Sequence, residues 1–203
     1  SASKITVALP GTDRYPFARC IGSPPKLLTC ASLIKRKGHD ILIEALCEIH
    51  DLNWQARFIG DETLDPKWAS ELRDRVALSG LSTQIEFVGT VANIASEYQN
   101  ADIFVLPSKF EGYGMVLSEA LAHGLPIIST RTGAIPEVVP ESAGILVKSE
   151  DHSALAAALK KLILDGDLRN KMQLSAQKAA STLPSWAACA ELIVKSMEII
   201  PKR

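Results

Sequence analysis

Short apolar runs alternate with amphipathic stretches through most of this 203-residue chain, and this alternation restricts the fold more than any other feature. Apolar residues at three-and-four spacing, as within residues 41–49, predict helices between the runs. Strands that are apolar throughout are buried on both faces, and strands that alternate with helices form parallel sheets. We therefore expect a doubly wound α/β domain with strand order 3-2-1-4-5-6. Its six predicted strands are Leu27–Cys30, Ala56–Ile59, Ile85–Val88, Ile103–Leu106, Pro126–Ser129 and Gly144–Val147.

The two ends of the chain differ from the alternating region. Residues 1–25 are rich in proline and glycine, which predicts a linker or N-terminal extension with one short strand, Ile5–Leu9. Residues 26–199 form the predicted domain, and after residue 150 the pattern predicts extra C-terminal helices near 153–164, 168–181 and 186–200. Asp165-Gly166-Asp167 resembles a metal-binding Asp-x-Asp motif, but a glycine C-cap followed by an aspartate N-cap explains it better. We expect no metal site.

Charge and cysteine usage narrow the expected environment. The formal net charge is -1 at pH 7, so we expect no nucleic-acid partner and no general attraction to an acidic membrane surface. The four cysteines lack C-x-x-C spacing and are interpreted as reduced packing residues. The sequence also lacks an apolar signal segment and a run long enough to span a bilayer, so the predicted location is cytoplasmic.

The first candidate for chemistry is the basic turn Lys35-Arg36-Lys37, which follows the first predicted strand. In a sheet of this order, ligands bind beyond the carboxyl ends of the first and fourth strands. The turn also enters a helix, whose N-terminal amides and dipole favour an anion. From this segment alone, a diphosphate site and a solvated basic turn are equally supported.

The segment after the fourth predicted strand is more specific. Gly112 and Gly114 allow a tight turn and a close approach of main-chain amides to a ligand. Glu111 lies in this turn, and Glu119 lies about one and a half turns into the following helix. The two carboxylates are therefore able to line one pocket at different depths, with one binding a hexose and the other a ribose.

The spacing from Glu111 to Glu119, in a Glu-Gly-aromatic-Gly context, resembles the Glu-x7-Glu signature of group 1 (family 4) glycosyltransferases. The similarity extends over nearly all of residues 26–199. It includes Lys37-Gly38-His39-Asp40, Phe58-Ile59-Gly60-Asp61 and the segments 101–108 and 124–130. Members of this family have two Rossmann-like halves that face a cleft, the GT-B fold. The chain resembles the C-terminal, nucleotide-sugar-binding half, with residues 5–15 resembling the interdomain connection.

The resemblance implies a role for each matching position. Lys37 would contact the donor diphosphate, Glu111 the donor sugar and Glu119 the ribose, so that Lys37 and Glu111 are the implied catalytic residues. The remaining implied donor-binding residues are Gly60 and Val88 near the base, and Gly112, Tyr113, Gly114, Met115 and Val116 near the sugar and phosphates.

Two positions depart from the family pattern. Ser32 stands where many relatives have arginine, which removes one phosphate ligand that Lys35 or Arg36 would have to replace. Glu62 stands where a second glycine is common, and its carboxylate would crowd or repel a nearby phosphate.

The function implied by the resemblance is transfer of a sugar from a UDP-, GDP- or ADP-sugar to an acceptor, with retention at the anomeric carbon. No cofactor is expected. The acceptor would bind to a missing N-terminal half, through which alone any membrane association would occur, and the isolated fragment would be inactive. A positioned lysine and aligned helix amides would stabilise the charge that develops on the leaving diphosphate.

Other functions compete with this one. A nicotinamide dehydrogenase is disfavoured because Leu117 replaces the third glycine of G-x-G-x-x-G and the turn follows the fourth strand. A non-catalytic nucleotide-sugar-binding module, or an epimerase or phosphorylase of the GT-B fold, remains open because fold alone does not separate these activities.

Overall fold

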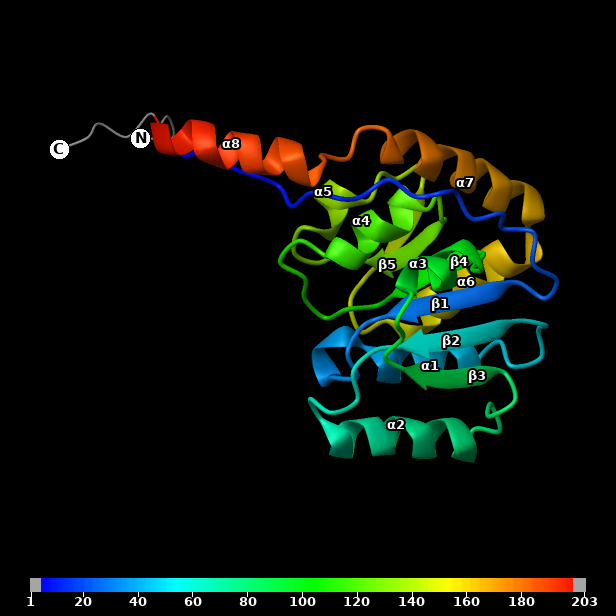
Figure 1. The fold of residues 1–203 in the computed structure, drawn as a ribbon. Helices are drawn as coiled ribbons and strands as arrows, with labels where there is room; N and C mark the ends of the chain where they lie inside the picture. The colour runs from blue at the N-terminus through cyan, green and yellow to red at the C-terminus, as the bar shows by residue number, and fades with distance from the viewer. Residues whose placement is uncertain (1–4, 199–203) are drawn as a thin grey trace.

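The computed structural model describes residues 5–198 and contains a six-stranded sheet of order β3-β2-β1-β4-β5-β6 (Figure 1). Every neighbouring pair of strands is parallel. The predicted doubly wound α/β class and strand order are confirmed. The strands are β1 (Lys26–Cys30), β2 (Gln55–Ile59), β3 (Ile85–Gly89), β4 (Ile103–Leu106), β5 (Ile127–Thr130) and β6 (Gly144–Val147).

Helices connect the strands and extend the chain beyond β6. Asp65 caps α2 by accepting a hydrogen bond from Trp68 N at 3.1 Å, and Asp151 caps α6 in the same way through Ala154 N at 2.8 Å. Within residues 5–198, none of the helices is long and apolar enough to cross a membrane. The helices are η2 (Lys35–Lys37), α1 (His39–Cys47), α2 (Pro66–Leu78), α3 (Ile94–Gln99), α4 (Met115–Ala122), α5 (Ile135–Val138), α6 (His152–Leu164), α7 (Gly166–Ala180) and α8 (Trp186–Glu198).

The sheet separates two apolar cores, and this explains why the central strand β4 is apolar throughout. Helices α1, α2 and α6 cover one face, while α3, α4 and α5 cover the other. Side chains alternate between the faces, so that Phe58 packs in the first core and the adjacent Ile59 packs in the second. All four residues of β4 are buried. Strand β4 is therefore shielded from solvent on both faces.

The N-terminal segment packs against helices, and the predicted strand Ile5–Leu9 is wrong. Thr12 N donates to Pro184 O at 2.8 Å just before α8, and Ala18 N donates to His123 O at 2.8 Å after α4. These neighbours offer no strand edge, and a strand needs such an edge for its backbone hydrogen bonds. The apolar side chain of Ile5 is accordingly 75% exposed. The boundary predicted between residues 25 and 26 stays a prediction.

The turn between α6 and α7 differs in detail from its prediction. Asp165 ends α6 and also caps α7, because its side chain accepts a hydrogen bond from Leu168 N at 2.8 Å. Gly166 is the first residue of α7, so the cap is the first aspartate of the motif and Asp167 follows inside the helix. In residues 5–198, no group of three or more His, Cys, Asp or Glu side chains is placed to hold a metal ion. The predicted end of the last helix, near residue 200, lies outside the described residues.

Candidate functional site

Two crossover loops meet at the carboxyl ends of β1 and β4. Lys109 N donates to Arg36 O at 2.8 Å, and Arg36 Nη1 donates to Phe110 O at 2.8 Å. Gly38 allows this close approach, since its φ is +72° and a Cβ there would lie 2.2 Å from Pro107 O. The hydrogen bonds therefore hold residues 36–38 directly against residues 107–111.

Lys37 and Glu111 form an ion pair at this junction, although they are 74 residues apart in the chain. Lys37 Nζ lies 2.6 Å from Glu111 Oε1, and Ser108 Oγ donates to the same oxygen at 2.7 Å. Arg36 Nη1 lies 3.7 Å from Glu111 Oε2. Glu111 is only 5% exposed, and a carboxylate at this depth needs such partners because burial removes its hydration. The two predicted catalytic residues thus share one buried cluster.

The loop after β5 fixes the main chain at Glu111. Thr130 Oγ1 donates to Ser108 O at 2.6 Å, and Ala134 N donates to Glu111 O at 3.3 Å. Gly133 has a φ of +54°, and a Cβ at this position would lie 1.9 Å from Glu111 O. These supporting contacts could not be assigned from the sequence. Ser108 and Thr130 lie in the segments that resemble the family, at the carboxyl ends of β4 and β5, but no role was predicted for them.

Two helix N-termini open onto the same edge of the sheet. Gly38 precedes α1 and Gly114 precedes α4, with φ angles of +72° and +82°. Among the described residues, neither helix receives a side-chain cap. Main-chain N–H groups in both first turns therefore remain suited to an anion. The predicted sugar and phosphate contacts lie here: Gly112 is exposed, Tyr113 and Val116 are half-buried, Gly114 is buried and Met115 is exposed.

Glu119 lies deeper on α4 and turns toward α3. Tyr98 Oη donates a hydrogen bond to Glu119 Oε2 at 3.0 Å. Burial raises the pKa of Glu119 above its ordinary value, while the hydrogen bond from Tyr98 acts in the opposite direction. Within the described part of the chain, the Glu119 side chain makes no hydrogen bond or ion pair with Lys37 or Glu111. The structure thus places the two glutamates at opposite ends of one segment, with separate partners.

Gly60 and Val88 lie at the carboxyl ends of β2 and β3. Gly60 N donates to Gly89 O at 2.9 Å, which ties the two strand ends together. A Cβ on Gly60 would lie 1.9 Å from Ala31 O, so glycine is needed for the loops after β1 and β2 to pack. Val88 is half-buried against the second core. Both positions therefore lie on the same edge of the sheet as Lys37.

Lys35 and Arg36 are the two cations expected to replace the arginine that is missing at Ser32. Lys35 Nζ lies 5.2 Å from the ring centroid of Trp68, so this cation packs against α2. Arg36 is therefore the neighbouring cation that remains beside Glu111. Glu62 Oε1 pairs with Arg73 Nη2 at 2.5 Å, which partly compensates the carboxylate that replaces glycine.

His39 is a buried neighbour of the basic turn. It is 0% exposed, and within residues 5–198 both of its ring nitrogens lack a hydrogen-bond partner. Burial lowers the pKa of His39 from 6.5 to about 4, and the nearby charge of Lys37 contributes in the same direction. His39 is therefore neutral near pH 7 and adds no positive charge to the site.

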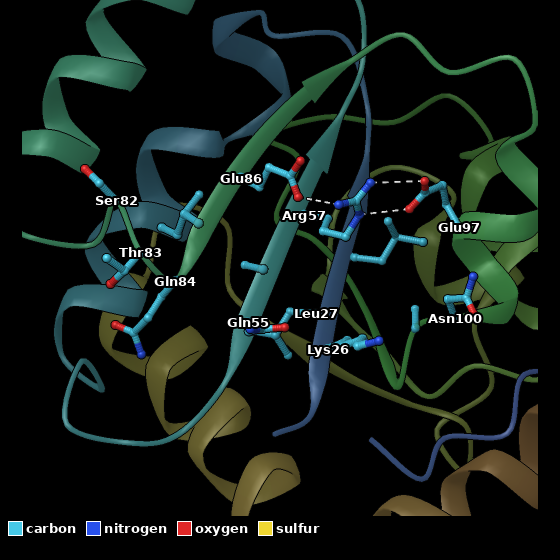
Figure 2. Close-up of a pocket in the computed structure, with 14 residues that line it drawn as sticks. Lys26, Leu27, Gln55, Arg57, Ser82, Thr83, Gln84, Glu86, Glu97 and Asn100 are labelled. Atoms are coloured by element: carbon cyan, nitrogen blue, oxygen red, sulfur yellow. Dashed lines mark hydrogen bonds and ion pairs between the residues drawn. The ribbon is translucent and has the colours of Figure 1, made fainter. Parts of the chain in front are cut away.

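A cavity of about 580 Å³ lies away from this edge, against β1, β2 and β3 (Figure 2). It is open because α3 has only six residues and leaves this face of the sheet partly uncovered. Arg57 points across the cavity between Glu86 and Glu97, and its Nε lies 2.9 Å from Glu97 Oε2. Because Arg57 already has two carboxylate partners, the cavity is a poor site for a diphosphate. The carboxyl edge of the sheet remains the candidate site.

Comparisons with known proteins identify the family of this chain. The family model described as "Glycosyl transferases group 1" matches residues 16–179. The D-inositol 3-phosphate glycosyltransferase of Corynebacterium jeikeium is 33% identical in an alignment that covers 95% of this chain and 49% of that protein. The chain spans about half the length of the curated relatives that it matches.

Solved structures share the fold. The C-terminal domain of a group 1 family glycosyl transferase, LpcC from Francisella tularensis, aligns with a TM-score of 0.72 at 29% identity. That alignment covers 87% of this chain and 95% of the other. HepE from Anabaena, in complex with UDP-glucose, aligns with a TM-score of 0.79 at 23% identity, covering 86% of this chain and 49% of HepE.

Proposed function

The chain belongs to the group 1 glycosyltransferases, and we propose that it is the donor-binding half of a retaining enzyme of this family. In this proposal it binds a nucleotide diphosphate sugar, while a second half binds the acceptor. The contact between Lys37 and Glu111, beside two uncapped helix N-termini, carries the proposal. The length of the chain supports a two-part enzyme, because it corresponds to about half the length of the curated relatives.

In the proposed mechanism, the diphosphate lies between Lys37 and the first-turn amides of α4. Negative charge develops on the diphosphate as its bond to the sugar breaks, while the anomeric carbon bonds to the acceptor oxygen and the acceptor hydroxyl releases its proton. Lys37 and the amides of α4 stabilise the charge on the diphosphate. When the donor binds, before this bond breaks, Lys37 exchanges its contact with Glu111 for the phosphate oxygens. The freed Glu111 oxygen accepts hydrogen bonds from sugar hydroxyls, while Ser108 keeps the carboxylate in place. One ion pair is thereby replaced by two donor contacts.

The nucleoside would extend from α4 toward the ends of β2 and β3. Glu119 is proposed to accept hydrogen bonds from the ribose hydroxyls, and Gly60 and Val88 to border the base. UDP is the first nucleotide to test, because HepE shares this fold and was solved with UDP-glucose. GDP and ADP remain the alternatives. The proposal requires no cofactor.

A calorimetric titration with UDP, GDP and ADP tests the proposed site. Lys37→Met should weaken binding of the preferred nucleotide about 10- to 100-fold, because a charged hydrogen bond contributes about 1.5–3 kcal/mol. The control is Lys160→Met, which replaces an exposed lysine on α6 and should bind as the wild type does. Thermal unfolding of each variant shows that it is folded. Equal affinities of the wild type and Lys37→Met would refute the assignment.

The proposal also predicts that this chain by itself binds the donor and transfers nothing, because the acceptor would bind to the other half. A radiolabelled UDP-sugar incubated with candidate acceptors should give no transfer product. Transfer by this chain would show that it carries a complete active site.

A further inference from the structure

Tyr98 lies buried between α3 and α4, where it contacts a predicted ligand-binding residue. Its side chain is 1% exposed. Its hydroxyl donates to Glu119 Oε2 at 3.0 Å and lies 3.4 Å from Val116 O in the first turn of α4. One hydroxyl thus touches both the carboxylate and the main chain of the helix that opens onto the donor site.

Stacked rings hold Tyr98 in place. Its ring lies 5.7 Å from that of Phe104 in β4 and 4.7 Å from that of His123 at the end of α4, centroid to centroid. The other face of His123 stacks on Tyr15 of the N-terminal segment at 4.3 Å. His123 Nδ1 also lies 2.8 Å from Glu119 O. The tyrosine ring is therefore held in place by contacts from several elements.

The contact with Tyr98 occupies only one oxygen of the Glu119 carboxylate. The hydroxyl orients the carboxylate through Oε2, and no hydrogen bond within residues 5–198 uses Oε1, which is therefore able to accept from a ligand. Because burial disfavours the ionised carboxylate, a donated hydrogen bond also helps to keep it charged. The titratable groups that face Glu119 from neighbouring elements are Tyr98, Asp13, Tyr15, Cys30 and His123.

We infer that Tyr98 is a positioning residue for donor binding: its hydroxyl holds the Glu119 carboxylate in the orientation that receives the ribose hydroxyls. This inference rests on the proposed function, since it takes Glu119 as the ribose ligand. It extends that function to a residue on α3 that touches no donor atom. Tyr98 acts through Glu119, so its effect should depend on the ribose.

The test compares Tyr98→Phe with the wild type, using whichever of UDP, GDP and ADP binds most tightly. Phenylalanine keeps the stacked ring and removes only the hydroxyl. Affinity for the ribonucleotide should fall about 10-fold, as expected for loss of one hydrogen bond that supports a buried charge. Affinity for the 2′,3′-dideoxy nucleotide and for inorganic pyrophosphate should be unchanged. An equal loss for all three ligands would mean a general structural role and would overturn the inference.

The pH dependence gives a second readout. Without the Tyr98 hydroxyl, the pKa of Glu119 should rise further, so the affinity deficit of Tyr98→Phe should grow as the pH falls toward the pKa of this carboxyl. A deficit that shrinks as the pH falls contradicts a role in positioning the charged carboxylate. Thermal unfolding at each pH shows that both proteins remain folded.

Glu119→Gln separates failure of this inference from failure of the proposed function. If Glu119→Gln weakens ribonucleotide binding and Tyr98→Phe does not, the inference about Tyr98 is wrong and the ribose assignment stands. If Glu119→Gln binds normally and the wild type does not discriminate against the dideoxy nucleotide, the ribose assignment itself is wrong.

Discussion

His39→Gln should make the stability of this protein less dependent on pH. His39 is fully buried beside the basic turn, and its pKa is about 4 in the folded chain compared with 6.5 ordinarily. Below pH 6.5 the unfolded chain therefore takes up a proton on this imidazole, while the folded chain remains neutral until near pH 4. The folded state consequently loses stability as the pH falls through this window, and the loss is absent above it.

The size of the effect follows from the two pKa values. The shift from 6.5 to about 4 corresponds to a loss of about 3 kcal/mol once both states are protonated. Between pH 7.5 and pH 5 the expected loss from His39 is about 2 kcal/mol, because protonation of the unfolded chain is then nearly complete. A change of this size is a large fraction of the stability of an ordinary domain.

Urea unfolding at pH 7.5 and pH 5 measures this contribution. Other groups also titrate in this range, so the informative quantity is the difference in pH dependence between the wild type and His39→Gln. The wild type should lose about 2 kcal/mol more than the variant. His50→Gln, at an exposed position, controls for the exchange of histidine for glutamine. Identical pH dependence in the wild type and His39→Gln would refute a buried, neutral His39.

Five further substitutions, two of them matched controls, test the loops, the caps and the open sheet face. Gly133→Ala places a methyl group 1.9 Å from a carbonyl oxygen and requires a left-handed backbone, so it should destabilise the chain by more than about 2 kcal/mol in urea unfolding. Gly166→Ala, in the first turn of α7, should not destabilise it. Asp165→Ala should cost about 1 kcal/mol because it removes the cap of α7, and Asp167→Ala should cost less. Arg57→Met should change stability by less than about 1 kcal/mol and leave nucleotide affinity unchanged, because its partly exposed ion pairs lie outside the proposed site; a tenfold loss of affinity would move the site to the cavity in Figure 2.

The fold was predictable because local patterns and topology point to the same answer. Runs such as Ile103–Leu106 are apolar on both faces, which requires cover on both sides of a parallel sheet. Once the strand order is known, the ends of the first and fourth strands must be neighbours. The proximity of Lys37 and Glu111 follows from that rule, and their roles in donor binding stay a prediction.

Features that depend on tertiary contacts were not predictable in the same way. Ile5–Leu9 has a strand-like composition, but the segment that follows it packs against helices, and helices offer no strand edge for pairing. In the sequence, nothing distinguishes Tyr98 from an ordinary aromatic residue of the core. Only the fold brings its hydroxyl to Glu119. Gly133 has no motif of its own, although its missing side chain leaves room for the main chain at Glu111.

Chemical-shift mapping of the ¹⁵N-labelled chain during titration with UDP tests the central claim most directly. If a diphosphate binds between the basic turn and the start of α4, the largest shifts should occur at the amides of residues 37–39 and 112–116, and Lys37→Met should need about 10- to 100-fold more ligand to reach the same shifts. Shifts confined to the face that carries Arg57 and Glu86, or no shifts at millimolar UDP, GDP and ADP, would contradict the proposed donor site.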